Sequence, residues 1–205
     1  EVTGNHATNG GGIFGFQAGL TMRNSRVTNN TAVEFGGGIN LDGANGSFSE
    51  TLVQGNQAGN GAGIAFTSGD DYTLTNTFIT DNILTDTAGR GAGLFAEWCV
   101  PELWHTTLAN NSGGDGSGIY LGTGLNDPPI DISGTIFAGQ EIGVYLGSGT
   151  VVNLADTLWA TGDWVNTAES AGDGTLNRGA VDLHGDPVFV DAANGDYHIL
   201  LSSAA

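Results

Sequence analysis

Residues 36–40 read GGGIN: three glycines in a row, followed at once by a β-branched aliphatic residue. The phrase returns as GGGIF at 10–14, GAGIA at 61–65, GAGLF at 91–95 and GSGIY at 116–120. Consecutive glycines mark tight turns or close approaches of the backbone, whereas isoleucine is typical of strands. A turn-to-strand phrase that recurs in this way indicates an internal repeat, so the residues upstream of it should share a period.

Three rows of residues recur upstream of the phrase with a single set of unequal steps. The first row is apolar and contains Met22, Phe48, Leu74, Leu103, Ile132 and Leu154. The second row lies three residues later and carries hydroxyl groups, at Ser25, Thr51, Thr77, Thr106, Thr135 and Thr157. The third row, two residues further on, is again apolar and contains Val27, Val53, Ile79, Leu108, Phe137 and Trp159. The steps are 26, 26, 29, 29 and 22 residues in every row, which places six copies of one unit in register.

Two further rows and a set of small residues complete the unit. An amide stands three residues beyond the third row, at Asn30, Asn56, Asn82, Asn111 and Gln140, whereas the sixth copy has Gly162 there. Within the glycine phrase, a fourth apolar row contains Ile13, Ile39, Ile64, Leu94, Ile119 and Val144. Small residues precede this row by two positions, at Gly11, Gly37, Ala62, Ala92 and Ser117, and Ile142 is the exception.

These rows predict an all-β solenoid. Residues two apart on a strand point to the same face, so the hydroxyl row and the apolar row that follows it belong to short strands whose side chains at these positions point inward. No segment keeps a helical period. Coils stacked at the strand spacing of about 4.8 Å would place equal rows above one another, forming an apolar interior and a ladder of hydrogen-bonded amides. We therefore predict a parallel β-helix with three short strands per coil and six to seven coils, in which the glycines form the corner before the second strand.

The phrases VTNNTAVEFGGGI (27–39), ITDNILTDTAGRGAGL (79–94) and LANNSGGDGSGI (108–119) resemble bacterial secreted and surface β-helix repeat proteins, including those related to chlamydial polymorphic outer-membrane proteins. HGDPVFVDAANGDYHIL (184–200) resembles the closing segment of large secreted β-helix proteins. The resemblance implies the right-handed, pectate-lyase-like superfamily and an extracellular or cell-surface location. It does not imply one activity, because lyases, hydrolases, adhesins and phage tailspikes share this fold.

The repeat divides the chain into two parts of one domain. Val2 and Asn5 fit a copy whose first two rows are missing, so we expect a truncated first coil in a fragment or processed product. Residues 1–162 are predicted to form the coils. The register is lost after Gly162, and we expect residues 163–205 to be a closing segment, with two short strands around an Asn-Gly turn. Such a segment would cover the open end of the solenoid.

Charge excludes several kinds of partner. The 205-residue chain has 22 acidic residues, four arginines and no lysine, for a formal charge of −18. This charge repels nucleic acid and anionic membrane surfaces. No apolar run reaches the length of a membrane span, so we expect no membrane insertion. Calcium is a plausible companion of so many carboxylates, although solubility or salt adaptation also explains them.

The residues do not contain a catalytic set of the kinds this superfamily implies. Calcium-dependent lyases of the fold use acidic side chains with a basic proton acceptor, yet there is no lysine, and Arg23, Arg26, Arg90 and Arg178 stand apart from paired acids. Polygalacturonases of this fold use three aspartates with a histidine further on. Asp70 and Asp71 match part of the aspartate set, but no Gly-His-Gly motif follows them. We interpret these two aspartates as loop caps. The sequence therefore favours a protein that is not an enzyme, with a lyase or hydrolase as an alternative.

Two small groups of residues have both a functional and a structural interpretation. Cys99 and His105 lie in the segment EWCVPELWH, which we interpret as an insertion. The two residues form a nucleophile pair, or else Cys99 is simply packed under two tryptophans. Asp191, Asn194 and Asp196 lie on one tight turn. They form either a calcium site or a turn held by its own side-chain hydrogen bonds.

An outward row of aromatic residues is the best candidate for ligand binding. Phe95, Tyr120 and Tyr145 each follow the fourth apolar row on successive coils, so their rings should form an exposed ladder. Trp98 and Trp104 are expected beside it. Exposed rings of this kind suit the faces of sugars, although cross-strand aromatic pairs also stabilise a sheet.

These observations lead to three ranked hypotheses. The first is a non-enzymatic extracellular module of a bacterial surface or secreted protein that acts in adhesion by binding a glycan or a surface protein. The second is a structural stalk or filament subunit that binds a second copy end to end through its open strand edges. The third is a polysaccharide lyase or hydrolase.

Overall fold

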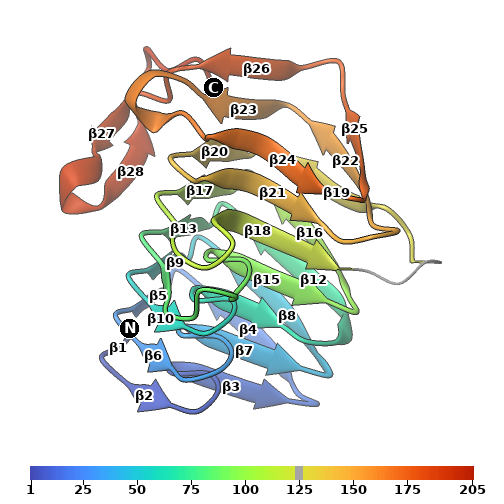
Figure 1. Ribbon diagram of the computed structural model, residues 1–205. Helices are drawn as coiled ribbons and strands as arrows, with labels where there is room; N and C mark the ends of the chain where they lie inside the picture. Colours follow the sequence, from blue (N-terminus) through green and yellow to red (C-terminus); the bar gives the residue numbers. More distant parts are fainter. Residues whose placement is uncertain (123–126) are drawn as a thin grey trace.

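The computed structural model describes residues 1–122 and 127–205, apart from the side chain of Asp70. The described chain forms a parallel β-helix of seven coils, which rise in Figure 1 from the blue N-terminal coil to the red C-terminal one. Each coil passes through sheet 1, sheet 2 and sheet 3 in turn, and these sheets run the length of the stack. The predicted fold class is confirmed. No helix in the described ranges is long and apolar enough to cross a membrane.

The strands are short. Sheet 1 consists of β1 (Val2–Thr3), β5 (Arg26–Thr28), β9 (Leu52–Gln54), β13 (Phe78–Thr80), β17 (Thr107–Ala109), β20 (Ile136–Ala138), β23 (Thr157–Ala160) and β26 (Asp182–Gly185). Sheet 2 consists of β3 (Ile13–Phe16), β7 (Ile39–Asp42), β11 (Ile64–Phe66), β15 (Leu94–Glu97), β18 (Ser117–Gly122), β21 (Ile142–Leu146) and β24 (Ala168–Gly172). Sheet 3 consists of β4 (Gly19–Arg23), β8 (Ala44–Ser49), β12 (Gly69–Thr75), β16 (Val100–Trp104), β19 (Ile130–Ser133), β22 (Val151–Ala155) and β25 (Thr175–Arg178). A short fourth sheet between sheets 1 and 2 contains β2 (His6–Ala7), β6 (Thr31–Ala32), β10 (Gln57–Ala58) and β14 (Ile83–Leu84).

The predicted apolar rows are the core of the protein. Strand pairing places the members of the first, third and fourth rows directly above one another, as in the series Val27, Val53, Ile79. Nearly all of these side chains are fully buried in one continuous cluster along the axis. Burial of each large aliphatic side chain contributes about 1.5–3 kcal/mol, so the stacked rows hold the coils together.

The glycine phrase forms a corner, as predicted, and it needs glycine for two different reasons. Gly61 opens one phrase with φ of 55°, in the left-handed region that favours glycine. Gly63 stands two residues later, and a Cβ there would lie 2.5 Å from the carbonyl oxygen of Gly93 and 3.0 Å from Nδ2 of Asn82. The first glycine thus turns the chain, and the third lets successive coils approach one another beside the amide ladder.

We expect Gly63→Ala to lower the free energy of unfolding by about 2 kcal/mol, because its methyl group must push apart two coils whose spacing the sheets fix. Urea unfolding measures the change. Gly19→Ala is the matched control: a Cβ at Gly19 has no atom within 4 Å, so stability should stay the same or rise slightly. Equal effects of the two substitutions would show that close packing does not require glycine at 63.

The amide row forms a buried ladder. Nδ2 of Asn56 donates to Oδ1 of Asn82 at 3.0 Å, and Nδ2 of Asn82 donates to Oδ1 of Asn111 at 3.0 Å. Each amide also binds backbone, for example Nδ2 of Asn82 to the carbonyl of Val53 at 3.1 Å. The ladder is interrupted at Gln140, whose buried side-chain nitrogen and oxygen find no hydrogen-bond partner among the described residues. The extra methylene carries the glutamine amide out of register with its neighbours.

Two further corners are formed without a glycine phrase, and these were not predicted. The residue before each member of the hydroxyl row has a left-handed backbone; Asn76 (φ 49°) and His105 (φ 52°) are two of them. The hydroxyl then donates to the carbonyl two residues earlier, as Thr77 Oγ1 does to Thr75 at 3.2 Å. The residue before each amide of the row from Asn30 to Gln140 is also left-handed, as at Asp81 (φ 57°). Asn and Asp tolerate this region better than most side chains, which explains their frequency there.

The predicted loss of register after Gly162 is wrong. A short 3₁₀ turn, η1 (Gly162–Trp164), delays the next amide by four residues, and Asn166 then accepts from the backbone nitrogen of Gln140 at 3.0 Å. Strands β24, β25 and β26 continue sheets 2, 3 and 1 in parallel register. The coils therefore extend to Gly185, and the signal was missed because most inward positions of the last coil, Leu176 excepted, are polar or small.

The closing segment is shorter than predicted and does not cover the end of the solenoid. An antiparallel hairpin of β27 (Phe189–Asp191), η2 (Ala192–Asn194) and β28 (Asp196–Ile199) lies along the outer side of sheet 1, at the upper left of Figure 1. Tyr197 donates its hydroxyl to Oδ1 of Asp81 at 2.7 Å, and its ring packs with Trp164 and Phe189. Apolar side chains on the outer face of sheet 1 explain this position, because the hairpin buries them.

Candidate functional site

The aromatic ladder on sheet 2 is stacked as predicted but is not exposed. The rings of Phe95 and Tyr120 stack at 5.2 Å, and those of Tyr120 and Tyr145 at 5.6 Å. Phe95 is only 4% exposed and Tyr120 only 5%, while Tyr145 is half-buried. Phe35 packs against Phe95, and Arg90 lies over Tyr120 and donates to its hydroxyl at 2.8 Å. The loop residues thus make this row a small outer core, and little ring surface is left for a sugar.

The two tryptophans lie elsewhere. The segment EWCVPELWH is not an insertion: it is the corner between β15 and β16, followed by β16 itself. Trp98 occupies the corner with a left-handed backbone (φ 58°) and is 65% exposed. Trp104 ends β16 on the outer face of sheet 3, half-buried, between Thr75 and Ser133 of the neighbouring strands. An indole exposed to this extent is the largest accessible aromatic surface among the described residues.

The outer face of sheet 3 is polar around Trp104. Trp104 Nε1 donates to Oε2 of Glu102, two residues earlier on the same face, at 3.3 Å. On the following coils, Asn177 donates to Asn153 and Asn153 donates to Oδ1 of Asp131, both at 3.0 Å. Strand β16 is the fourth of the seven strands in this sheet, so the face extends for three coils on either side of Trp104. We call this outer face of sheet 3, together with Trp98 at its corner, the tryptophan face.

Cys99 belongs to the core rather than to a nucleophilic site. It is 3% exposed, and its Sγ lies 3.9 Å from the carbonyl oxygen of Phe66. Burial is the main reason that the pKa of the Cys99 thiol is raised to about 12; the carboxylates of Asp127 and Glu97 also act to raise it, while a backbone hydrogen bond acts to lower it. The thiolate is therefore absent at neutral pH. The alternative of a Cys99–His105 nucleophile pair has no support, because the thiol faces the interior.

The residues proposed for calcium bind to one another and to a histidine. Asn194 donates to Oδ2 of Asp191 at 2.8 Å, and Oδ1 of Asp196 lies 2.6 Å from Nδ1 of His198. This hydrogen bond with His198 lowers the pKa of Asp196. No cluster of three His, Cys, Asp or Glu side chains that could hold a metal is found among the described residues. The arrangement matches the alternative interpretation of a turn held by its own side chains.

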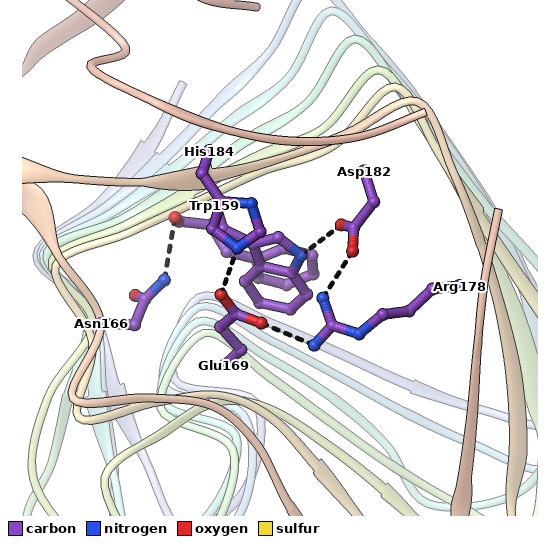
Figure 2. Close-up of polar contacts among 7 residues, drawn as sticks. Trp159, Asn166, Glu169, Arg178, Asp182 and His184 are labelled. Carbon is purple, nitrogen blue, oxygen red and sulfur yellow. Dashed lines mark hydrogen bonds and ion pairs between the residues drawn. The ribbon is translucent and has the colours of Figure 1, made fainter. Parts of the chain in front are cut away.

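A network of charged side chains closes the C-terminal end of the core (Figure 2). Arg178 donates to Oε2 of Glu169 and to Oδ2 of Asp182, both at 2.6 Å. Glu169 also lies 2.6 Å from Nε2 of His184, and Asp182 accepts from Nε1 of Trp159 at 2.7 Å. Partial burial lowers the pKa of Arg178, but its hydrogen bonds with Asp182 and Glu169 outweigh this effect and raise it overall.

Each member of this network occupies an inward position that is apolar or small in the earlier coils. Arg178 pairs with Leu154, Asp182 with Thr157, and His184 with Trp159. Glu169 takes the position of the third glycine, next to Gly143 of the preceding coil. The apolar core therefore ends at Trp159, beneath a layer of charges that bond mainly to one another.

Grooves lie on both sides of β28, where the hairpin overhangs sheet 1. One has a volume of about 600 Å³ and is largely apolar, with Ile136 and Leu158 among the residues that line it. The other, of about 890 Å³, contains Arg26 and Glu50. His105 lines both grooves. Both grooves lie along the contact between the hairpin and sheet 1, and the apolar groove continues the apolar surface of that contact.

The remaining candidates for catalysis are dispersed. Arg23 and Arg26 are both exposed, on β4 and β5 across one corner. Asp71 lies on strand β12 and is exposed, so it does not cap a loop. The side chain of Asp70 lies outside the described part of the chain. Arg90 and Arg178 are engaged by Tyr120 and by the C-terminal network.

Comparison with known proteins gives no relative: no family model, no curated protein and no solved structure matches this chain.

Proposed function

We propose that this chain is a non-catalytic, extracellular β-helix module that binds polysaccharide along the tryptophan face. The observation that carries the proposal is the exposure of Trp98, at 65%, on the same coil as Trp104. Trp98 and Trp104 are six residues apart, so they are separated by at most about 20 Å along the strand. An extended chain of sugar rings could contact both of them.

The surroundings of Trp104 support a sugar as the ligand. A sugar ring presents an apolar face to an aromatic ring and hydroxyl groups around its edge. The tryptophan face offers hydroxyls of Thr73 and Thr75 on one side of β16, and the carboxylate of Asp131 and the amide of Asn153 on the other. Side chains held by cross-strand hydrogen bonds lose little freedom on binding, which favours affinity.

Trp104→Ala is expected to weaken polysaccharide binding about tenfold or more, equivalent to roughly 1.4 kcal/mol, since buried aromatic contacts dominate binding energies. Affinity electrophoresis through gels containing different neutral and acidic polysaccharides measures this. Tyr145→Ala is the matched control, because it removes a half-buried ring from the aromatic row on sheet 2. Binding that survives Trp104→Ala but is lost in Tyr145→Ala would move the site to sheet 2, and no binding to any glycan would refute the proposal.

The two alternatives receive less support. End-to-end assembly would have to place the charged network of Arg178 and Glu169 against the apolar first coil of another copy, which requires their desolvation. A lyase or hydrolase would need an acid and a base across one cleft, whereas the guanidinium of Arg90 lies over the ring of Tyr120 and donates to its hydroxyl. Location at a bacterial cell surface stays part of the proposal, supported by the resemblance of the repeat phrases.

A further inference from the structure

We propose that this chain forms a domain-swapped dimer in which two copies exchange their C-terminal hairpins, residues 189–199. The binding site is the outer face of sheet 1 that the hairpin covers, and the partner is the hairpin of a second copy. This face is separate from the tryptophan face on sheet 3, so the exchange is independent of polysaccharide binding.

The hairpin is held on sheet 1 by side chains. Among the described residues, β27 and β28 pair only with each other, so no ladder of backbone hydrogen bonds joins them to the coils. Tyr197 is 2% exposed and donates its hydroxyl to Asp81 at 2.7 Å, and the rings of Phe78 and His198 lie 4.9 Å apart. A second copy carries the same groups in the same arrangement. The face that accepts the chain's own hairpin therefore offers the same contacts to the hairpin of another copy.

The segment that joins the hairpin to the last coil is strained. Strand β26 ends at Gly185 and β27 begins at Phe189, so residues 186–188 form the hinge. Val188 has φ of 45° and is the only β-branched residue with a positive φ in the described part of the chain. The left-handed region is unfavourable for such a residue, because its Cβ crowds the backbone. The turn persists because the backbone nitrogen of Val188 donates to Oδ1 of Asp186 at 2.8 Å and because the hairpin is docked beyond it.

The direction of the hairpin defines how two copies would lie. Nε2 of Gln54 on β9 donates to the carbonyl oxygen of Gly195 at 3.4 Å, and β9 is five strands from β26 in sheet 1, or about 24 Å. The hairpin therefore runs back along its own coils. A three-residue hinge spans at most about 10 Å when extended, so opening it directs the hairpin past the C-terminal end. The second copy must then lie end to end with the first, related by a two-fold axis.

The hinge decides between the closed chain and the dimer. The contacts of the hairpin with sheet 1 are the same in both states, so they favour neither. The strain at Val188 is present only in the closed chain, and formation of one dimer releases it twice. Association costs translational and rotational freedom, so the dimer is favoured as concentration rises. Charges of both signs lie at the facing ends, for example Arg178 and Glu169, so these ends do not repel one another.

Cross-linking between chains that carry one substitution each tests the exchange. Phe78→Cys and His198→Cys chains are mixed, unfolded, refolded together at high concentration and treated with a short bifunctional maleimide. Only an exchanged hairpin brings the two introduced thiols together, so we expect a covalent heterodimer. The native Cys99 is 3% exposed and does not react in the folded chain. A mixture of Ser47→Cys and His198→Cys chains is the matched control: Ser47 is exposed on sheet 3, and no heterodimer should form.

The role of the hinge is tested by removing its strain. Val188→Gly relieves the closed chain, so we expect it to weaken dimerisation about tenfold or more in sedimentation velocity. Val165→Gly is the control, because Val165 is 59% exposed and has an extended backbone (φ −61°, ψ 136°). It should dimerise like the unmodified chain.

The outcomes are distinct. A heterodimer that forms equally well with Ser47→Cys would indicate association without exchange, and absence of both heterodimers would show that each hairpin stays on its own chain. Either result overturns the swapped dimer. Unchanged dimerisation in Val188→Gly would overturn the role of the hinge. A chain with both Phe78→Cys and His198→Cys must cross-link, within one chain or between two, which checks that the variants still dock the hairpin.

Discussion

Replacing Asn82 with alanine is expected to lower the free energy of unfolding by about 3 kcal/mol, because the buried groups that it serves would lose their partners. Asn82 is fully buried in the middle of the amide ladder. It accepts from the backbone nitrogen and from Nδ2 of Asn56, both at 3.0 Å, and donates to Asn111 and to the carbonyl of Val53. Water cannot reach these groups without separating the coils. Urea unfolding followed by circular dichroism measures the loss.

Asn153 provides the matched control for Asn82. It also belongs to an amide row, with hydrogen bonds to Asp131 and Asn177, but this row lies on the outer face of sheet 3. Solvent replaces its partners, so Asn153→Ala should change stability by no more than about 0.5 kcal/mol. If Asn82→Ala were equally mild, the ladder would be a consequence of the coil geometry and not a source of its stability.

The core was predictable because it repeats. Each apolar row occurs in several copies of the repeat. The equivalent residues of the other copies therefore predict the position of a residue such as Phe137, even though its size differs from theirs. The register of the repeat alone also predicts Asn82 beside its partners in the ladder. The repeat does not reveal the last coil, because Arg178 and His184 stand there at positions that are apolar in the earlier coils. A pattern of apolar rows cannot identify a coil whose inward side chains are charged.

The candidate site was only partly predictable for a different reason. The stacking of Phe95 and Tyr120 follows from strand register, which the sequence determines. Their burial depends on the loops that carry Phe35 and Arg90, and loop paths do not follow from the repeat. The sequence indicates Trp98 and Trp104 as ligand residues but predicts an insertion around them, because the corner of their segment has no glycine phrase.

The charges of the last coil predict how the molecule behaves at its ends. A variant with Glu169→Gly, Arg178→Leu, Asp182→Thr and His184→Val restores the residue types of the earlier coils at the four positions of the charged network. It is expected to self-associate at least tenfold more strongly than the unmodified chain. Sedimentation velocity over a range of concentrations measures this, and a variant with Arg178→Lys and His184→Gln, which keeps the end polar, is the control.

The physical reason lies in what the last coil exposes. Strands β24, β25 and β26 each have one edge without a paired strand among the described residues, and such edges invite the addition of another chain. In the natural sequence an added coil would have to desolvate Arg178, Glu169 and Asp182, whose hydrogen bonds mainly satisfy one another. An apolar end removes that penalty and adds hydrophobic contact. If the restored variant sediments like the unmodified chain, the charges are not what limits growth, and the position of the hairpin beside the coils becomes the better explanation.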